Sequence, residues 1–255
     1  MRHARVLRYA GLAAAFAVAA VAFAQSTVTP VAPDATVETK PLVEAKPVWG
    51  DEKRGAQKAG TCAACHGLDG NPTDPQYPRL AGMPERYIAH QLELFKNGQR
   101  TTGMAAVMKP FADALTAQDM RDLGAHFAMQ KAGAGVADDT AIATGPNAGM
   151  KFYEVGERLF RQGDLSRGIP ACMACHGPAG GGNPGPAYPA IAGQQSAYAQ
   201  RRLEEYRAGT TTQTDPHQFN IMASVAKPLT DEEIQSLASY VQGLHKRSDD
   251  ATASQ

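Results

Sequence analysis

The stretch Thr61-Cys-Ala-Ala-Cys-His-Gly67 returns 110 residues later as Ala171-Cys-Met-Ala-Cys-His-Gly177. Both copies have the spacing C-x-x-C-H, the attachment signature of a c-type haem. Residues three apart share one face of a helical turn, so both thiols of a copy can bond to the vinyl groups of one porphyrin. The histidine that follows is predicted to ligate the iron. The predicted haem-binding residues are Cys62, Cys65, His66, Cys172, Cys175 and His176.

The two motifs contain all 4 cysteines of the chain. A redox dithiol of the thioredoxin kind would not need the histidine after the second cysteine. A zinc site with four thiolate ligands would need the two pairs to meet from opposite halves of the chain, with both histidines unused. We therefore predict two covalently bound haem c groups.

The N-terminus has the features of a secretory signal. A basic stretch precedes the apolar run Gly11–Phe23, and Ala22-Phe23-Ala24 fits an A-x-A cleavage site. The apolar run is too short to span a bilayer comfortably, although a retained anchor is the alternative. Residues 1–24 are expected to be cleaved. Export to the periplasm agrees with haem c, which is assembled outside the cytoplasm.

The composition of the chain argues against nucleic-acid partners and indicates two flexible segments, one near each end. The chain has 25 Lys and Arg against 25 Asp and Glu, and this balance does not favour nucleic-acid binding. Residues 25–48 contain four prolines without any helical period, so they are predicted to form a Pro-rich flexible tether. Residues 248–255 are expected to be a disordered tail.

The two halves of the chain form an internal repeat. Tyr77-Pro-Arg-Leu-Ala-Gly82 matches Tyr188-Pro-Ala-Ile-Ala-Gly193 at an offset of 111, and Leu115-Thr116 matches Leu229-Thr230 at 114. The repeat predicts one domain over residues 49–131 and a second over 150–247. A linker rich in Gly, Ala and Asp, residues 132–149, joins them.

Each half is predicted to be all-α, with three main helices. The expected ranges are 51–59 and 151–161, 85–97 and 196–208, and 117–130 and 231–244. Both last helices begin with a capping box, Thr116-x-x-Asp119 and Thr230-x-x-Glu233. Gly55 and Gly156 lack side chains on the first helices, and they are expected to let the last helix of the same half cross closely.

The sixth ligand of each iron is predicted from the alignment of the repeat. In the second half, the only methionine after the haem motif is Met222, seven residues before Leu229. Counting back seven residues from Leu115 gives Met108. Both methionines are expected in loops that face the haem motifs. Met104 is an alternative that requires a four-residue shift, and His217 is a weaker rival of Met222.

Pro78 and Pro189 follow the two haem motifs at similar distances. Their carbonyls could accept a hydrogen bond from Nδ1–H of His66 and His176, which would orient the imidazoles and increase their donation to iron. A plain turn proline is the alternative.

Over residues 51–245 this pattern resembles the dihaem cytochrome c4 family. The resemblance rests on the two C-x-A-C-H motifs, Y-P-x-[LI]-A-G after each, the axial methionine and L-T-x-x-[DE] before the final helix. It implies two tandem class I cytochrome c domains related by a pseudo-twofold axis. It also implies haems near the domain interface, ligated by His66 with Met108 and by His176 with Met222. Members are periplasmic electron carriers, often membrane-associated, and their partners include terminal oxidases.

We therefore expect an electron carrier and not an enzyme, working between a respiratory donor, such as a quinol-oxidising complex, and a terminal oxidase or reductase. Two ligands on each iron leave no open position for a substrate. One alternative is the electron-accepting subunit of a periplasmic dehydrogenase. Another is a dihaem peroxidase-like enzyme, which needs a labile iron position with acid–base groups beside it. A tethered haem sensor is a third. The sequence leaves open the two potentials and the direction of electron flow.

Overall fold

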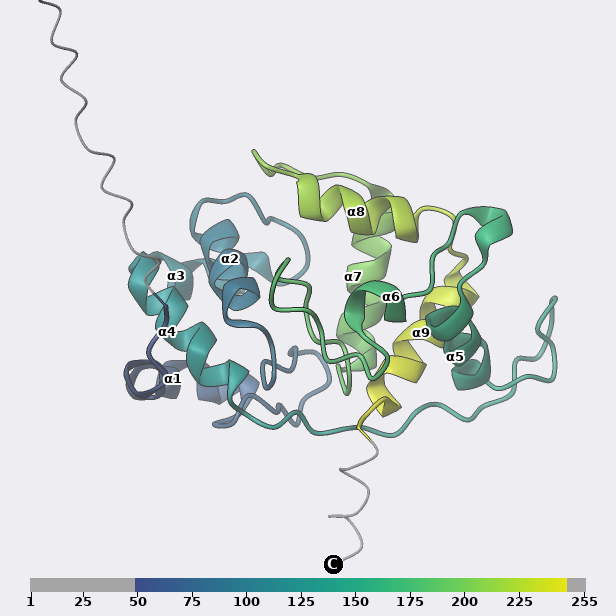
Figure 1. Ribbon diagram of the computed structural model, residues 1–255, viewed down its shortest axis with the longest axis horizontal. Coiled ribbons are helices and arrows are strands. Elements are labelled where there is room, and N and C mark those ends of the chain that lie inside the picture. The colour runs from purple at the N-terminus through teal and green to yellow at the C-terminus, as the bar shows by residue number, and fades with distance from the viewer. Residues whose placement is uncertain (1–48, 247–255) are drawn as a thin grey trace, which may run out of the picture. The chain divides into compact units, whose positions relative to one another are not determined.

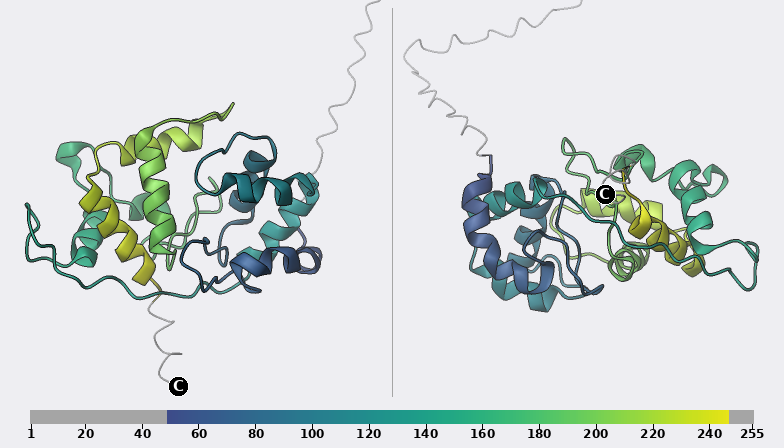
Figure 2. Two further views of the ribbon diagram at one scale, coloured as in Figure 1. Left: turned by 180° about the vertical axis from the view of Figure 1, so that it is seen from behind. Right: turned by 90° about the horizontal axis from the view of Figure 1, so that it is seen from below.

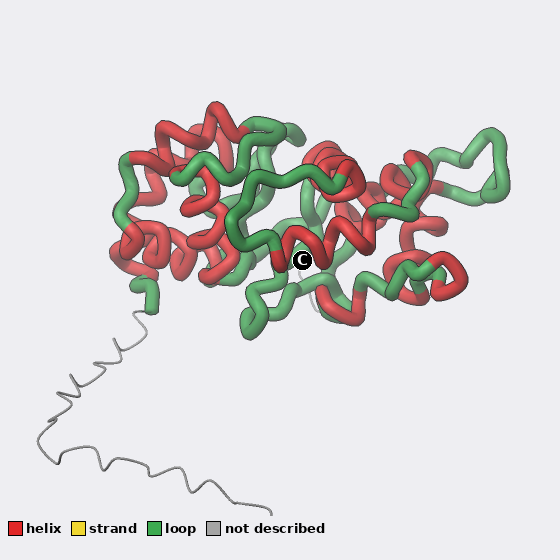
Figure 3. The backbone as a smooth tube through the Cα atoms, turned by 90° about the horizontal axis from the view of Figure 1, so that it is seen from above, coloured by secondary structure: helices red, strands yellow, loops and turns green. Residues whose placement is uncertain are grey.

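The structure is a computed structural model that describes residues 49–246. The predicted signal peptide, tether and C-terminal tail lie outside the described residues. Within residues 49–246 the chain consists of helices joined by loops and contains no β-strand, only isolated bridges (Figure 3). The all-α prediction is confirmed. No helix in this range has both the length and the apolar character needed to cross a bilayer.

The helices form two groups that follow each other along the chain (Figure 1). The first group is α1 (Glu52–His66), α2 (Glu85–Lys96), α3 (Ala105–Asp113) and α4 (Ala117–Ala128). The second group is α5 (Phe152–Gln162), α6 (Met173–His176), α7 (Ser196–Ala208), α8 (His217–Ala226) and α9 (Asp231–Gly243), with a 3-10 turn at Leu165–Arg167. In both groups the last helix packs on the first helix and on the helix that follows the haem motif: α4 on α1 and α2, and α9 on α5 and α7.

The crossing of the first and last helices depends on a glycine in each half. A Cβ atom on Gly55 would lie 2.0 Å from the carbonyl oxygen of Asp122. A Cβ atom on Gly156 would lie 2.1 Å from the carbonyl oxygen of Ser236. Both distances are far below van der Waals contact, so only glycine permits these crossings. The prediction for Gly55 and Gly156 is confirmed.

Both predicted capping boxes are present. Thr116 Oγ1 accepts a hydrogen bond from the Asp119 amide at 3.1 Å, and Asp119 Oδ2 accepts one from the Thr116 amide at 2.9 Å. The equivalent distances for Thr230 and Glu233 are 3.2 and 2.9 Å. Each box satisfies two backbone donors at the start of its helix. The apolar face of each helix is buried, through Leu123, Phe127, Leu237 and Val241.

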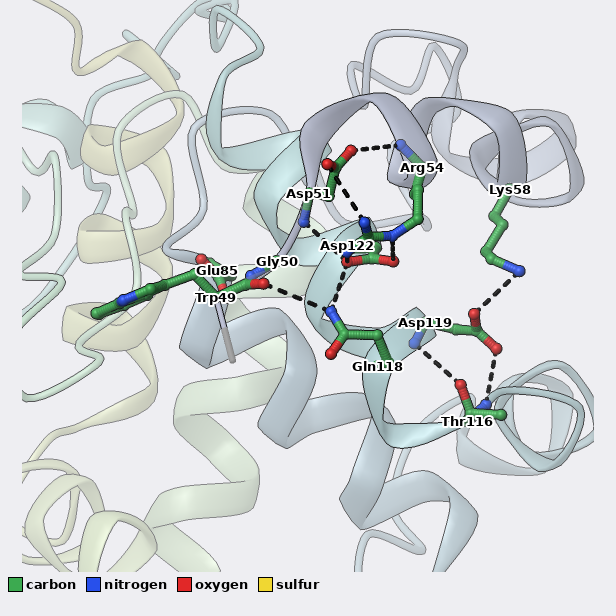
Figure 4. Close-up of polar contacts among 10 residues, drawn as sticks. All are labelled: Trp49, Gly50, Asp51, Arg54, Lys58, Glu85, Thr116, Gln118, Asp119 and Asp122. Carbon is green, nitrogen blue, oxygen red and sulfur yellow. Dashed lines mark hydrogen bonds and ion pairs between the residues drawn. The ribbon is translucent and has the colours of Figure 1, made fainter. Parts of the chain in front are cut away.

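In the first half, a buried carboxylate fastens α4 to the start of α1 (Figure 4). The Asp122 side chain is 2 % exposed and accepts from Arg54 Nε at 2.8 Å, Arg54 Nη2 at 3.0 Å, the Asp51 amide at 2.8 Å and Gln118 Nε2 at 2.7 Å. These bonds hold the pKa of Asp122 well below its ordinary value, the Arg54 bond most of all. The matching position of α9 is Ser236, so the described part of the second half has no counterpart of this carboxylate.

The haem motifs lie in different local structures, which the sequence analysis did not predict. In the first half, α1 continues through Cys62 to His66 instead of ending near residue 59. In the second half, α5 ends at Gly163 with φ +67°, and the motif lies in the separate one-turn helix α6. The cause is an insertion, because the segment from Gly156 to Cys172 is nine residues longer than its counterpart from Gly55.

Met108 and Met222 lie in helices, so the prediction of loops was wrong. Met108 lies in α3, and Met222 lies in α8. α3 packs on α2, and α8 packs on α7. These helices are short, and Pro110 inside α3 resembles a helix breaker in the sequence. Packing against the longer helix compensates for the backbone hydrogen bond that Pro110 removes.

The segment between the two halves runs beside the C-terminal part of α9 (Figure 2). The Gly135 amide donates to the Gln242 carbonyl at 2.9 Å, and Gln242 Nε2 donates to the Val136 carbonyl at 2.6 Å. The Asp138 amide donates to Ser239 Oγ at 2.8 Å. Residues 135–138 are therefore fastened to the second half.

Candidate haem-binding sites

The structure brings each predicted haem motif and its predicted methionine into one cavity. The first cavity has a volume of about 620 Å³, and the second about 170 Å³. The first is lined by Cys62, Cys65, His66, Met104 and Met108, among others. The second is lined by Cys172, Cys175, His176 and Met222, among others. His217 is exposed and is not among the residues that line the second cavity.

The cysteines are available for covalent attachment. None of the four forms a disulfide. Within residues 49–246, no group of three or more His, Cys, Asp or Glu side chains could hold a metal ion, so the two pairs are not joined in a zinc site. Burial raises the pKa of the Cys62 thiol and raises that of Cys172 to about 11. A raised pKa keeps these two thiols neutral, and a neutral thiol is a poorer zinc ligand than a thiolate.

The two motif histidines have one ring nitrogen fixed and the other left for iron. His66 Nδ1 lies 2.9 Å from the Pro78 carbonyl oxygen, and His176 Nδ1 lies 2.9 Å from that of Pro189. A carbonyl can only accept, so Nδ1 carries the proton and the Nε2 lone pair is free for a metal. Burial lowers the pKa of both imidazoles, against the opposing effect of the proline bonds. Both predicted proline contacts are therefore present.

Two arginines give the first cavity unsatisfied positive groups, which the sequence analysis missed. Arg79 and Arg100 line this cavity. Nε and Nη1 of Arg79 and Nε of Arg100 are buried without a hydrogen-bond partner among the described residues. The two carboxylates of a haem would supply the acceptors that these atoms lack. A signal for Arg79 existed, since it is the one charged residue in the repeated Y-P-x-[LI]-A-G stretch.

Burial agrees with the alignment that selects Met108. Ala112 lies one turn after Met108, as Ala226 lies one turn after Met222, and both alanines are 0 % exposed. Met104 is the residue at the N-terminus of α3, one turn before Met108 on the same face, and it also lines the cavity. The choice of Met108 stays a prediction.

Comparison with known proteins places this arrangement in a family. Residues 52–129 and 153–245 each match the cytochrome c family. Cytochrome c4 of Pseudomonas aeruginosa is 39% identical over 197 residues, covering 77% of this chain and 90% of the relative. A thiosulfate dehydrogenase electron acceptor of Thiomonas intermedia is 37% identical over 186 residues, covering 72% and 78%.

A solved structure gives the same result. The crystal structure of reduced recombinant cytochrome c4 from Pseudomonas stutzeri matches with a TM-score of 0.65 and 37% identity, covering 77% of this chain and 100% of that one. The match therefore includes the whole of that protein and both halves of this one. The chain belongs to the cytochrome c4 family of electron carriers, and its two cytochrome c domains bind two covalent haem c groups.

Proposed function

We propose that this chain carries electrons in the periplasm between a respiratory donor and a terminal oxidase or reductase. The observation that supports this most is that each cavity contains a fixed histidine and a methionine from a separate helix. His66 with Met108, and His176 with Met222, would ligate the two irons from opposite sides. A thioether ligand raises the reduction potential of a haem. The haem supplies one-electron chemistry when bound, and the chain supplies its burial and ligands.

The two cavities share a wall, which supports electron exchange within the molecule. Met83, Tyr87, Gln91 and Tyr198 line both cavities. Tyr87 and Tyr198 are equivalent positions of the repeat, and their phenol groups lie close enough for each to shift the pKa of the other. Tyr198 Oη also accepts from Arg100 Nη2 at 3.3 Å. We propose that an electron crosses from one domain to the other through this wall.

Optical spectra of single methionine variants test the ligand set. We expect two low-spin haems that do not bind CO in the unmodified protein. Met222→Ala and Met108→Ala should each convert one haem to the high-spin form and lower its potential, because the thioether is lost. Met104→Ala is the matched control in the first cavity and should leave both haems low-spin.

Two results would contradict these assignments. One high-spin haem in the unmodified protein would exclude the simple carrier and favour an enzyme or a sensor. Two low-spin haems with unchanged potentials in Met108→Ala, together with a high-spin haem in Met104→Ala, would make Met104 the ligand.

The location is tested on the mature protein. Mass spectrometry of protein from the producing cell should give Gln25 as the first residue, because Ala24 ends the predicted cleavage site. A retained N-terminus would instead support an anchored form. For the cleaved form, release from the membrane by salt would measure peripheral association.

A second candidate function is electron acceptance within a dehydrogenase complex. The 37% identity to a thiosulfate dehydrogenase electron acceptor supports it. Stable co-purification with a catalytic chain, and reduction of both haems by the substrate of that chain, would favour this role. A monomeric carrier that an oxidase oxidises rapidly would favour the first.

A further inference from the structure

One peptide group beside the first haem site has a hydrogen bond at each end. The Pro78 carbonyl accepts from His66 Nδ1 at 2.9 Å, and the Arg79 amide donates to Gln194 Oε1 at 2.8 Å. The carbonyl of Pro78 and the amide of Arg79 belong to the same peptide unit. Gln194 lies in the second half of the chain. A hydrogen-bond relay therefore runs from Gln194, through this peptide, to His66.

The relay is buried and its end is held in place. Gln194 is 3 % exposed, Arg79 7 % and His66 6 %. Gln194 Nε2 donates back to the Arg79 carbonyl at 3.1 Å, and the Gln195 amide donates to Gln194 Oε1 at 3.0 Å. Hydrogen bonds in series polarise one another in a low dielectric, by roughly 10–30% per bond. The Gln194 bond therefore makes the Pro78 oxygen a stronger acceptor for the His66 proton.

The second half lacks this relay. His176 Nδ1 lies at the same 2.9 Å from the Pro189 carbonyl. The repeat offset of 111 matches Gln194 with Met83, and Met83 packs with Ala190 in one apolar cluster. A thioether sulfur is only a weak acceptor. Within residues 49–246, no acceptor is hydrogen-bonded to the Ala190 amide. The two proximal histidines therefore differ in what lies behind their proline carbonyls.

We propose that Gln194 is a positioning residue that tunes the first haem across the domain interface. This inference rests on the proposed ligation of iron by His66. A stronger acceptor at Nδ1 makes the imidazole a better donor at Nε2, which favours ferric iron. Gln194 thus lowers the potential of the first haem and makes the two haems unequal. The Arg79 cation acts in the opposite direction, so a test must leave Arg79 unchanged.

The test is Gln194→Met, which installs the residue found at the matching position of the first half. In a redox titration of the holoprotein, we expect the first haem to shift about three- to tenfold toward the ferrous form, a tenfold shift being about 59 mV. The second haem should keep its potential. The Nδ1–H proton resonance of His66 in the ferrous protein should move upfield, because its hydrogen bond weakens. Each haem is identified through the variant that removes its methionine.

Gln195→Met is the matched control. Gln195 Nε2 donates to the Pro72 carbonyl at 3.0 Å across the same interface, but Gln195 lies outside the side-chain path to His66. If the relay operates, Gln195→Met leaves the first potential unchanged. An equal shift in both variants would mean that a loosened interface, and not the relay, sets the potential, and this would overturn the proposal.

The outcomes also separate this proposal from the carrier function. Unchanged potentials in Gln194→Met, with both haems low-spin, would overturn the relay and leave the carrier intact. If Gln194→Met does not assemble, hydrogen exchange of the unmodified protein decides. The Arg79 amide should exchange more slowly than the Ala190 amide, and equal rates would contradict the relay.

Discussion

Asp122 shows how much a single side chain can contribute to the first domain. Its carboxylate accepts four hydrogen bonds from three residues, and it fastens α4 to α1. Arg54 is half-exposed and can return to water when the carboxylate is removed. Removing the Asp122 carboxylate therefore costs mostly the free energy of its hydrogen bonds, and it does not leave an unpaired charge in the interior.

Asp122→Asn should lower the free energy of unfolding of the first domain by about 1–3 kcal/mol at pH 7. The pKa of Asp122 is depressed in the folded state, so its contribution is full above the unfolded pKa of about 3.9 and is lost as pH falls toward the folded value. Denaturant unfolding at pH 7 and pH 3 measures this. The difference between the two proteins should shrink at pH 3, and a constant difference would contradict the electrostatic account.

Asp113→Asn is the control for a surface ion pair. Asp113 accepts from Lys109 Nζ at 2.8 Å, and both side chains are 49% exposed. Exposed pairs of this kind contribute about 0–1 kcal/mol. If Asp113→Asn lowered the free energy of unfolding as much as Asp122→Asn does, burial would not be the reason for the effect of Asp122.

At the scale of elements, the first and last helices of each domain can pack closely only because a glycine lies at their crossing. Gly55 lies against the carbonyl of Asp122, whereas Gly60 in the same helix has no atom within 4 Å of a Cβ position. Gly55→Ala should destabilise the first domain by about 1–3 kcal/mol, because backbone cannot yield as a side chain can. Gly60→Ala, at an exposed position of the same helix with no protein atom in reach, should not cause this loss. Thermal unfolding of the pair measures both, and equal effects would contradict the close crossing.

Much of this element structure could be predicted from the repeat. The haem motifs and the capping boxes could be predicted in both copies because each depends on local chemistry at a fixed spacing, and Gly55 and Gly156 could be predicted because each lies on the first helix of its half. The separation of α5 from α6 could not be predicted, since it follows from an insertion with its own turn. The helical form of α3 was hidden by Pro110. Met104 and Met108 stay hard to distinguish because both lie on one face of that helix.

At the scale of the whole molecule, the contacts between the halves were beyond the sequence analysis. Arg79 and Gln194 belong to different repeats, and no pattern within one repeat says which of its residues will face the other. The alignment of the two copies did show where they differ, although it did not show the contact with Arg79. It pairs Gln194 with Met83, and it shows that the two copies differ there.

The contacts between residues 135–138 and α9 are predicted to stabilise the fold without affecting the haems. The backbone carbonyl of Gln242 accepts from the Gly135 amide, and its side chain bonds to the Val136 carbonyl and the Ser196 amide. Gln242 is not among the residues that line either cavity. Gln242→Ala should lower the free energy of unfolding by about 0.5–1.5 kcal/mol for each lost side-chain bond. Both potentials should stay unchanged in a redox titration. A shift in either potential would show that the linker transmits strain to a haem site.

The contact between Tyr87 and Tyr198 has a historical consequence. A residue that meets its own equivalent is the mark of an isologous contact, the kind that joins two copies of one protein about a twofold axis. A single ancestral domain would have had both sides of this contact on one surface and could have paired with itself. Duplication and fusion would then have made the pairing permanent and independent of concentration. Once the copies were joined, positions 83 and 194 no longer had to be the same residue.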